Sequence, residues 1–220
     1  MRVVLTRESG RNDQLRAWLH DAVDVDEIPL TLTVTFDDEV ASAIESLHVH
    51  EFRYLVVTSA RAADAAARAA ARVEAPVLSV GPVTSAALAA RGVDVAGEAT
   101  SAAAVADLIE AGPVLTLGAR ETRPELAQAL GERGISVAHL ACYATLPAEL
   151  TDEQARRLAA ADVVFIGAPS AWAVARAHVR ATTWVVVPGE TTGEVVRASH
   201  ERVHVGWGPD LATTLVGLVS

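Results

Sequence analysis

Short loops rich in glycine and small hydroxyl residues are the part of this chain that could carry chemistry. Glycine lets a ligand approach the backbone, and the first turn of a helix offers N–H groups and a positive dipole end to an anion. Several such loops around one ligand would bind a polyanion, whereas each loop alone is explained equally well by helix capping. The clearest loops are Thr58-Ser59-Ala60-Arg61, Gly81-Pro82-Val83-Thr84, Gly118-Ala119-Arg120-Glu121-Thr122, Gly167-Ala168-Pro169-Ser170 and Gly189-Glu190-Thr191-Thr192.

The basic residues are compatible with the same chemistry. All 18 of them are arginine, and the planar guanidinium group binds carboxylates through two parallel hydrogen bonds. Most of these arginines are also explained by composition and by solvated helix faces. The net charge of −10 argues against a nucleic-acid groove. The absence of lysine excludes a Schiff base and a phosphate loop of the usual kind.

The familiar catalytic and metal-binding patterns are missing. The chain contains no G-x-S-x-G, Walker or G-x-G-x-x-G motif. His48 and His50 read as surface residues, because no partner ligands cluster near them. The single cysteine, Cys142, excludes an internal disulfide and any cysteine-based zinc site. Trp207 could line a cleft or fill a core, and the sequence leaves both readings open.

The elements that position these loops follow a βαβα rhythm. Apolar runs rich in β-branched residues alternate with helical stretches rich in alanine and leucine, of which Ala102–Ala111 is one. Strands that are apolar throughout belong in parallel sheets covered on both faces, so the fold class is α/β. The strands are expected near residues 2–6, 23–28, 54–58, 77–80, 93–96, 114–117, 136–141, 163–166, 184–187 and 203–205.

Bulk properties favour packed cores and a cytoplasmic protein. The hydrophobic fraction is 51% and the mean hydropathy is +0.28, so disorder is not expected. No apolar run approaches the ~18 residues that a membrane-spanning helix needs. Met1 leads directly into an apolar strand without a charged and then apolar leader.

The loops also recur in an order that indicates an interrupted duplication. The loops ending the runs at Thr58 and Gly81 have counterparts at Gly167 and Gly189. The counterpart of the Gly118 loop stands at the N-terminus, where Val3-Val4-Leu5-Thr6-Arg7 precedes a helix. The second copy therefore starts at residue 1, breaks off, and resumes after the first copy ends. A domain inserted into a similar domain makes a hinged clamp, which points to a ligand held between the two.

Two alternating stretches mark the expected crossings between the copies. Residues 29–35 alternate like an exposed strand, and Cys142-Tyr143-Ala144-Thr145-Leu146-Pro147 does the same about 110 residues later. We expect residues 29–35 and 143–147 to pair as a two-stranded β linker. The inserted α/β domain would then span 36–142, and the discontinuous α/β domain 1–28 plus 148–220.

These features together resemble the uroporphyrinogen-III synthase family over essentially the whole chain. Each motif is short and degenerate, but their order, their spacing and the inserted-domain layout are more specific. The matching pieces are Val4–Arg7, Leu55–Ser59, Val80–Thr84, Arg91-Gly92-Val93, Glu132–Val137, Cys142–Pro147 and Gly189–Thr192.

The resemblance implies a fold of two similar parallel-sheet, flavodoxin-like domains and an enzyme of tetrapyrrole, and hence porphyrin and heme, synthesis. Such an enzyme is a lyase that closes the linear hydroxymethylbilane and inverts the last pyrrole ring, giving uroporphyrinogen III and water. No metal or organic cofactor is implied. The partner is a small-molecule substrate with eight carboxylates, rather than nucleic acid or a membrane, and a monomer is expected.

The resemblance also assigns roles to individual residues. Tyr143 stands where the family has a cleft-facing tyrosine and would act as a weak acid at the leaving hydroxyl, although a packing role at the hinge is its simpler alternative. The expected substrate-binding residues are Thr84, Thr191, Thr192, Ser59, Arg7 and Ser101.

Departures from the family pattern keep other functions open. The Gly167-Ala168-Pro169-Ser170 loop lacks two hydroxyls, and Glu190 puts negative charge where proline is common. One alternative is a diverged, non-catalytic tetrapyrrole- or anion-binding sensor of the same fold. Another is a two-domain enzyme that binds phosphate or nucleotide, which the absence of lysine disfavours.

Overall fold

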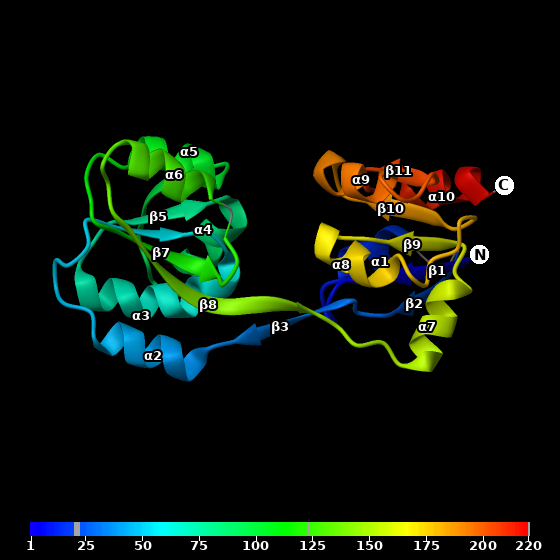
Figure 1. Cartoon of the computed structure of the whole chain (residues 1–220), viewed down its shortest axis with the longest axis horizontal. Coiled ribbons are helices and arrows are strands. Elements are labelled where there is room, and N and C mark those ends of the chain that lie inside the picture. The colour runs from blue at the N-terminus through cyan, green and yellow to red at the C-terminus, as the bar shows by residue number, and fades with distance from the viewer. Residues whose placement is uncertain (20–22, 123, 220) are drawn as a thin grey trace. The chain divides into compact units, whose positions relative to one another are not determined.

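The chain folds into two compact units. A computed structural model describes residues 1–19, 23–122 and 124–219. The discontinuous unit comprises Met1–Leu32 and Leu146–Ser220, and the inserted unit comprises Thr33–Thr145. The inserted unit therefore interrupts the discontinuous unit in the sequence, while each unit has its own sheet and its own core (Figure 1).

The discontinuous unit is a parallel sheet covered by helices on both faces. Its strands run in the order β11-β10-β9-β1-β2, and each pair is parallel. Val3 and Leu5 pack with one helix layer while Val4 packs with the other, as alternation along a strand requires. The strands are β1 Arg2–Leu5, β2 Asp24–Glu27, β9 Val163–Phe165, β10 Trp184–Val187 and β11 Val203–Val205. The helices are α1 Asp13–Leu19, α7 Asp152–Ala159, α8 Pro169–Ala175, α9 Glu190–Arg197 and α10 Leu211–Val219.

The inserted unit has the same layered architecture. Its six-stranded sheet has the order β3-β8-β7-β4-β5-β6, with α2 and α3 on one face and α5 and α6 on the other (Figure 1). The strands are β3 Thr31–Thr35, β4 Tyr54–Val57, β5 Val77–Val80, β6 Val95–Ala99, β7 Val114–Ala119 and β8 Val137–Pro147. The helices are α2 Asp37–Glu45, α3 Ala63–Val73, α4 Pro82–Ala89, α5 Ala102–Val105 and α6 Glu125–Glu132, with 3₁₀ helices η2 at Ala60–Ala62 and η3 at Ala106–Leu108.

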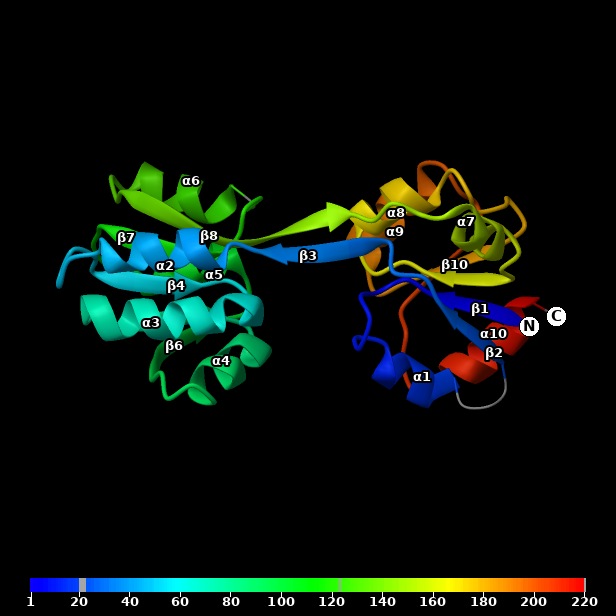
Figure 2. The ribbon, with the colours of Figure 1, turned by 90° about the horizontal axis from the view of Figure 1, so that it is seen from below.

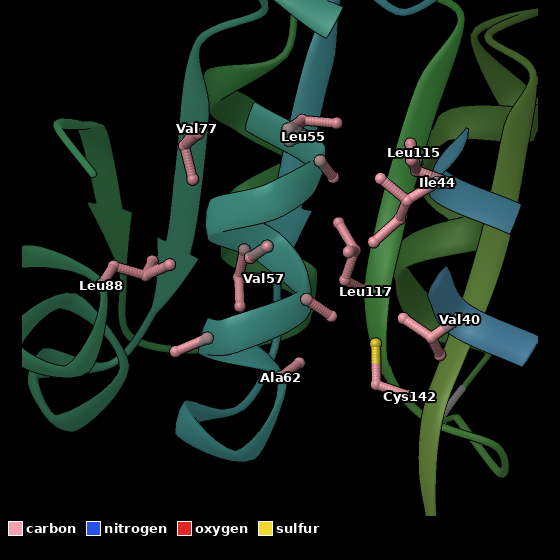
Figure 3. Packing of buried hydrophobic residues seen from close by; sticks show 14 of the residues in the cluster. Val40, Ile44, Leu55, Val57, Ala62, Val77, Leu88, Leu115, Leu117 and Cys142 are labelled. Carbon is pink, nitrogen blue, oxygen red and sulfur yellow. The ribbon is translucent and has the colours of Figure 1, made fainter. Parts of the chain in front are cut away.

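Small side chains let α3 lie close to its sheet. Ala65, Ala66, Ala69 and Val73 of α3, and Ala62 just before it, are buried and recur at the spacing of one helix face. They belong to one apolar cluster with side chains of the central strands and of α2. Figure 3 labels Ala62 together with strand and α2 residues of this cluster. The alanine-rich composition of this stretch therefore serves packing, because alanine combines high helix propensity with little volume.

The strand orders confirm the duplication that the loops indicated. Five strands of the inserted unit, β8-β7-β4-β5-β6, occupy the same places as β2-β1-β9-β10-β11 of the discontinuous unit. Numbered along the discontinuous unit, both orders read 2-1-3-4-5, which is the flavodoxin-like arrangement. The inserted unit starts its chain at the third of these positions, so it is a circular permutation of its host. The predicted fold class is thereby confirmed.

Strands β3 and β8 are the two segments in which the chain passes from one unit to the other. They are neighbours in the sheet and run side by side in Figures 1 and 2. The Phe36 N–H donates to Cys142 O, and the Ala148 N–H donates to Leu30 O at 2.9 Å. The residue number on β8 falls as the residue number on β3 rises, so this pairing is antiparallel.

Candidate functional site

A pocket lies where the strand order of the inserted sheet reverses direction. Open α/β sheets bind ligands at the carboxyl ends of the strands at such a switch point, here between β7 and β4. The pocket has a volume of about 330 Å³. It is lined by Thr58, Val80, Ala102, Thr116, Ala119, Glu121, Thr122, Leu126, Ala127, Val137, His139 and Tyr143.

The lining combines apolar walls with a few polar groups. Val80, Leu126 and Val137 belong to or pack on the same apolar cluster of the inserted unit. Hydroxyl, imidazole and carboxylate groups complete the lining. Such a mixture suits a ring that needs apolar contact and a limited number of directed hydrogen bonds.

Glycine at position 118 is required by the close approach of Thr58. A Cβ at this position would overlap the Thr58 Oγ1 atom. The Thr58 hydroxyl donates to Leu117 O at 3.4 Å, so it stays close to β7. The glycine of this loop therefore serves the packing of β4 against β7 and brings the Thr58 side chain to the pocket.

Tyr143 lies on β8 at the same edge of the sheet. The residue is 7% exposed and lines the pocket. The register of β7 and β8 shifts between Gly118 and Ala119, and this irregularity brings Tyr143 opposite Ala119. The guanidinium of Arg61 lies 5.5 Å from the centre of the Tyr143 ring, a cation–π contact that restrains the ring.

His139 and Thr116 form a polar pair in the lining. The two ring nitrogens of His139 lie 2.8 Å from Thr116 Oγ1 and 2.8 Å from Ala119 O. Thr116 is buried, and its hydroxyl also lies 3.2 Å from Ala138 O. The sequence analysis missed both residues. The available signal was period-two alternation, which puts Val137 and His139 on one face of β8.

Two predicted serines cap short helices. The Ser59 hydroxyl accepts from the Arg61 N–H at 3.3 Å, and the Ser101 hydroxyl accepts from the Ala104 N–H at 3.1 Å. A hydroxyl that accepts in this way keeps its own proton to donate. Capping and substrate binding are therefore compatible roles for both serines.

Thr84 is buried in the first turn of α4 rather than in the pocket lining. The helix begins after Gly81, which has a φ of 81°. The neighbouring Ser85 hydroxyl bonds Ser79 and donates to the Glu98 carboxylate, which ties α4 to β5 and β6. The start of α4 is thus held in place by side chains on two strands.

The remaining predicted residues belong to the discontinuous unit. Arg7 is exposed and follows β1, next to Thr6, whose hydroxyl donates to Phe165 O across the switch point of this sheet. Thr191 is exposed and Thr192 is buried, both in the first turn of α9. The structure therefore brings Tyr143 into the pocket of the inserted unit and places these three residues in the other unit.

Glu190, which introduces negative charge at the start of α9, is paired locally. Arg197 Nη1 lies 2.6 Å from Glu190 Oε2. The hydrogen bond from Arg197 lowers the pKa of Glu190 from its usual value. The carboxylate is consequently balanced by a cation about two turns along the same helix.

The family comparison covers most of the chain. The family model for uroporphyrinogen-III synthase HemD matches residues 20–205. The chain belongs to the uroporphyrinogen-III synthase family. This match confirms the resemblance seen in the motifs.

Solved structures of uroporphyrinogen-III synthases share the fold at low sequence identity. The enzyme from Helicobacter pylori is 16% identical, with a TM-score of 0.68 and 100% of both chains covered. A mutant enzyme from Thermus thermophilus is 17% identical, with a TM-score of 0.64, 99% of this chain and 96% of that chain covered. No curated protein matches the sequence.

The described part of this uroporphyrinogen-III synthase family member has neither a candidate metal cluster nor a membrane-spanning helix. Residues 1–19, 23–122 and 124–219 contain no group of three or more histidine, cysteine, aspartate or glutamate residues that could hold a metal ion. Among the same residues, no helix has the length and apolar character needed to cross a membrane.

Burial raises the pKa of the Cys142 thiol to about 11, so this thiol stays protonated near neutral pH.

Proposed function

We propose that this chain is a uroporphyrinogen-III synthase that closes hydroxymethylbilane and inverts its last pyrrole ring. The observation that carries this proposal is a tyrosine, Tyr143, in the pocket at the switch point of a fold shared with the family. A small anionic tetrapyrrole in the cytosol is the proposed substrate, and a monomer without a cofactor is the proposed working form.

The chemistry needs one proton at the start and releases one at the end. Tyr143 donates its phenolic proton to the hydroxymethyl oxygen, the C–O bond breaks, and water leaves. The remaining azafulvene cation is stabilised by the electron-rich pyrrole. The substituted carbon of the last ring attacks this cation and forms a spiro intermediate. Fragmentation and reclosure at the other carbon give the inverted ring, and the proton lost on rearomatisation returns to the phenolate.

The main task of the protein is to control conformation. Closure of hydroxymethylbilane without an enzyme gives the non-inverted isomer I, because the unsubstituted carbon of the last ring reacts directly. Holding the linear tetrapyrrole so that the substituted carbon of its last ring meets the cation selects isomer III. Apolar walls such as Leu126 and Val137 can hold a pyrrole face while hydroxyls at the rim hold its substituents.

The eight carboxylates of the substrate need many hydrogen-bond donors. Hydroxyls that cap helices retain a donor for a carboxylate, as at Ser59 and Ser101. The Glu190–Arg197 ion pair moderates the charge beside the first turn of α9. The proposed contacts are Thr84, Ser59 and Ser101 in the inserted unit and Arg7, Thr191 and Thr192 in the discontinuous unit.

A coupled assay tests the proposal. Hydroxymethylbilane is generated in place, the protein is added, and the porphyrin isomers are separated after oxidation. A product consisting mostly of isomer III supports the synthase. Isomer I alone, with a protein shown to be folded by circular dichroism, would contradict it. Tetrapyrrole binding without turnover would then indicate a diverged binding protein of the same fold.

A further inference from the structure

His139 is an exposed residue, yet both nitrogens of its ring have hydrogen-bond partners on β7. The Nε2 atom lies 2.8 Å from Ala119 O, and because a carbonyl oxygen only accepts, Nε2 donates this hydrogen bond. The Nδ1 atom lies 2.8 Å from the hydroxyl of the buried Thr116. Both contacts are made to β7, so the imidazole is fixed across the two strands.

The carbonyl that His139 holds belongs to the peptide plane between Ala119 and Arg120. The N–H of the same plane donates to Tyr143 O at 2.6 Å. The C=O and N–H groups of a trans peptide point in opposite directions. Two residues of β8, His139 through its side chain and Tyr143 through its backbone, therefore hold this plane from its two sides.

This plane lies where the regular ladder of β7 and β8 is interrupted. The register of β7 and β8 shifts between Gly118 and Ala119, and the His139 side chain contacts the Ala119 carbonyl at this point. The next two residues after the plane, Glu121 and Thr122, line the pocket. The Arg120 guanidinium lies 4.0 Å from the centre of the Phe36 ring, which restrains the segment on its other side.

We propose that His139 is a positioning residue that orients the Ala119–Arg120 peptide plane and, through it, Tyr143. This inference rests on the proposed synthase function. His139 does not act on the substrate itself, because both ring nitrogens are engaged with β7. Replacing His139 should loosen Tyr143, which donates the proton, while leaving the pocket walls in place.

A pair of amide substitutions tests this role. The amide of glutamine reaches the position of Nε2, whereas the amide of asparagine reaches only that of Nδ1. His139→Gln should therefore retain the bond to Ala119 O and keep kcat within about twofold of the wild type. His139→Asn should lower kcat about tenfold with little change in KM, since misplacement of a catalytic group by about 1 Å can cost up to about 100-fold.

A double substitution distinguishes action through Tyr143 from a general structural effect. If His139 works through Tyr143, adding His139→Asn to Tyr143→Phe should lower kcat by less than about twofold further. Amide hydrogen exchange gives a readout without turnover: exchange at the Arg120 amide should be faster in His139→Asn and unchanged in His139→Gln.

His200 offers a matched control in the discontinuous unit. Its Nε2 lies 2.7 Å from Thr183 O, so it makes the same kind of histidine–carbonyl bond in the discontinuous unit, which holds none of the residues that line the pocket. His200→Asn should affect stability and leave kcat of the folded protein within about twofold.

The outcomes separate this inference from the proposed function. A wild-type protein that makes isomer III together with a His139→Asn variant of unchanged kcat overturns the inference and leaves the synthase standing. Equal losses in the glutamine and asparagine variants, or additive losses with Tyr143→Phe, also overturn it. A wild-type protein that makes only isomer I overturns the proposed function, and the role of His139 with it.

Discussion

At the residue scale, the catalytic proposal depends on one hydroxyl group. Tyr143 and Tyr54 are the only tyrosines in the chain, and both lie on strands of the inserted sheet. Tyr143 lines the pocket, whereas Tyr54 packs on the apolar cluster beneath α5 and α6. The two residues therefore provide a test and its control within one sheet.

Removing the phenolic hydroxyl should slow the reaction without unfolding the protein. We expect Tyr143→Phe to lower kcat by about ten- to a hundredfold, at the low end of general acid catalysis because the substrate ionises readily. Steady-state rates of isomer III formation measure this effect. Tyr54→Phe should retain the wild-type rate, and a Tyr143→Phe variant with wild-type kcat would leave only a packing role for this side chain.

The buried thiol of Cys142 predicts a loss of stability at high pH. Its pKa is raised from 9.0 to about 11 by burial, so in the folded state the thiol holds its proton more firmly than in the unfolded state. Between pH 9 and 11 the unfolded state loses this proton first. The stability contribution is thus complete below pH 9 and is lost as the pH rises through about 11.

Urea unfolding at pH 8 and pH 10.5 measures this contribution. The wild type should lose up to ~2 kcal/mol more between these two conditions than Cys142→Ala, which has no thiol to titrate. Equal losses in the two proteins would show that the thiol does not control alkaline stability.

At the scale of elements, helix endings depended on side chains distant in the sequence. The alanine-rich stretch Ala102–Ala111 predicted one helix, but α5 ends at Val105 and η3 ends at Leu108. Arg133 donates from Nη1 to Ala106 O at 2.8 Å and from Nη2 to Ile109 O at 2.5 Å. These charged donors satisfy carbonyls at the helix end, and propensity could not reveal them because Arg133 lies on the far side of β7 in the sequence.

Removing this guanidinium should destabilise the inserted unit. Arg133→Met keeps the apolar stem and deletes both donors, so we expect a loss of about 1–2 kcal/mol in the free energy of unfolding by urea. Arg156→Met is a matched control, because Arg156 is exposed and contacts Asp152 O and the Glu153 carboxylate, both in its own helix α7. Its loss should stay below about 0.5 kcal/mol. Equal losses in the two variants would contradict the bridging role of Arg133.

Strand β8 also differs from its sequence-based expectation. The sequence predicts a core strand at residues 136–141 and a separate alternating stretch after it, whereas the structure has one strand over Val137–Pro147. Period-two alternation does not record how far a strand continues. The register shift between Gly118 and Ala119, which aligns Tyr143 with the pocket, depends on the partner strand and so has no local signal.

At the scale of the whole molecule, each unit has its own sheet and its own apolar clusters. The antiparallel pairing places Leu32 opposite Leu146, because Leu30 and Ala148 are hydrogen-bonded in the same register. Residues opposed in such a ladder lie about 4.5–5.5 Å apart at Cα. A short turn could therefore rejoin the discontinuous unit if residues 33–145 were removed.

We expect the rejoined discontinuous unit to fold alone. Replacing residues 33–145 by Asn-Gly, a pair that suits a two-residue hairpin turn, should give a protein with one cooperative urea transition followed by circular dichroism. Residues 1–32 and 146–220, mixed as two separate peptides, are the control for the effect of joining them by the turn. A non-cooperative or unfolded product would show that the discontinuous unit requires the inserted one.

The sequence by itself determined the architecture of this protein. Apolar strands, helix starts and repeated loops are local patterns, so they revealed the α/β class, the interrupted duplication and the family. The tertiary structure decided how the pocket is built. Residues such as His139 and Thr116 carry no motif, and they act together because β7 and β8 pair in one register with one irregularity. That register depends on packing between segments, and no single segment contains it.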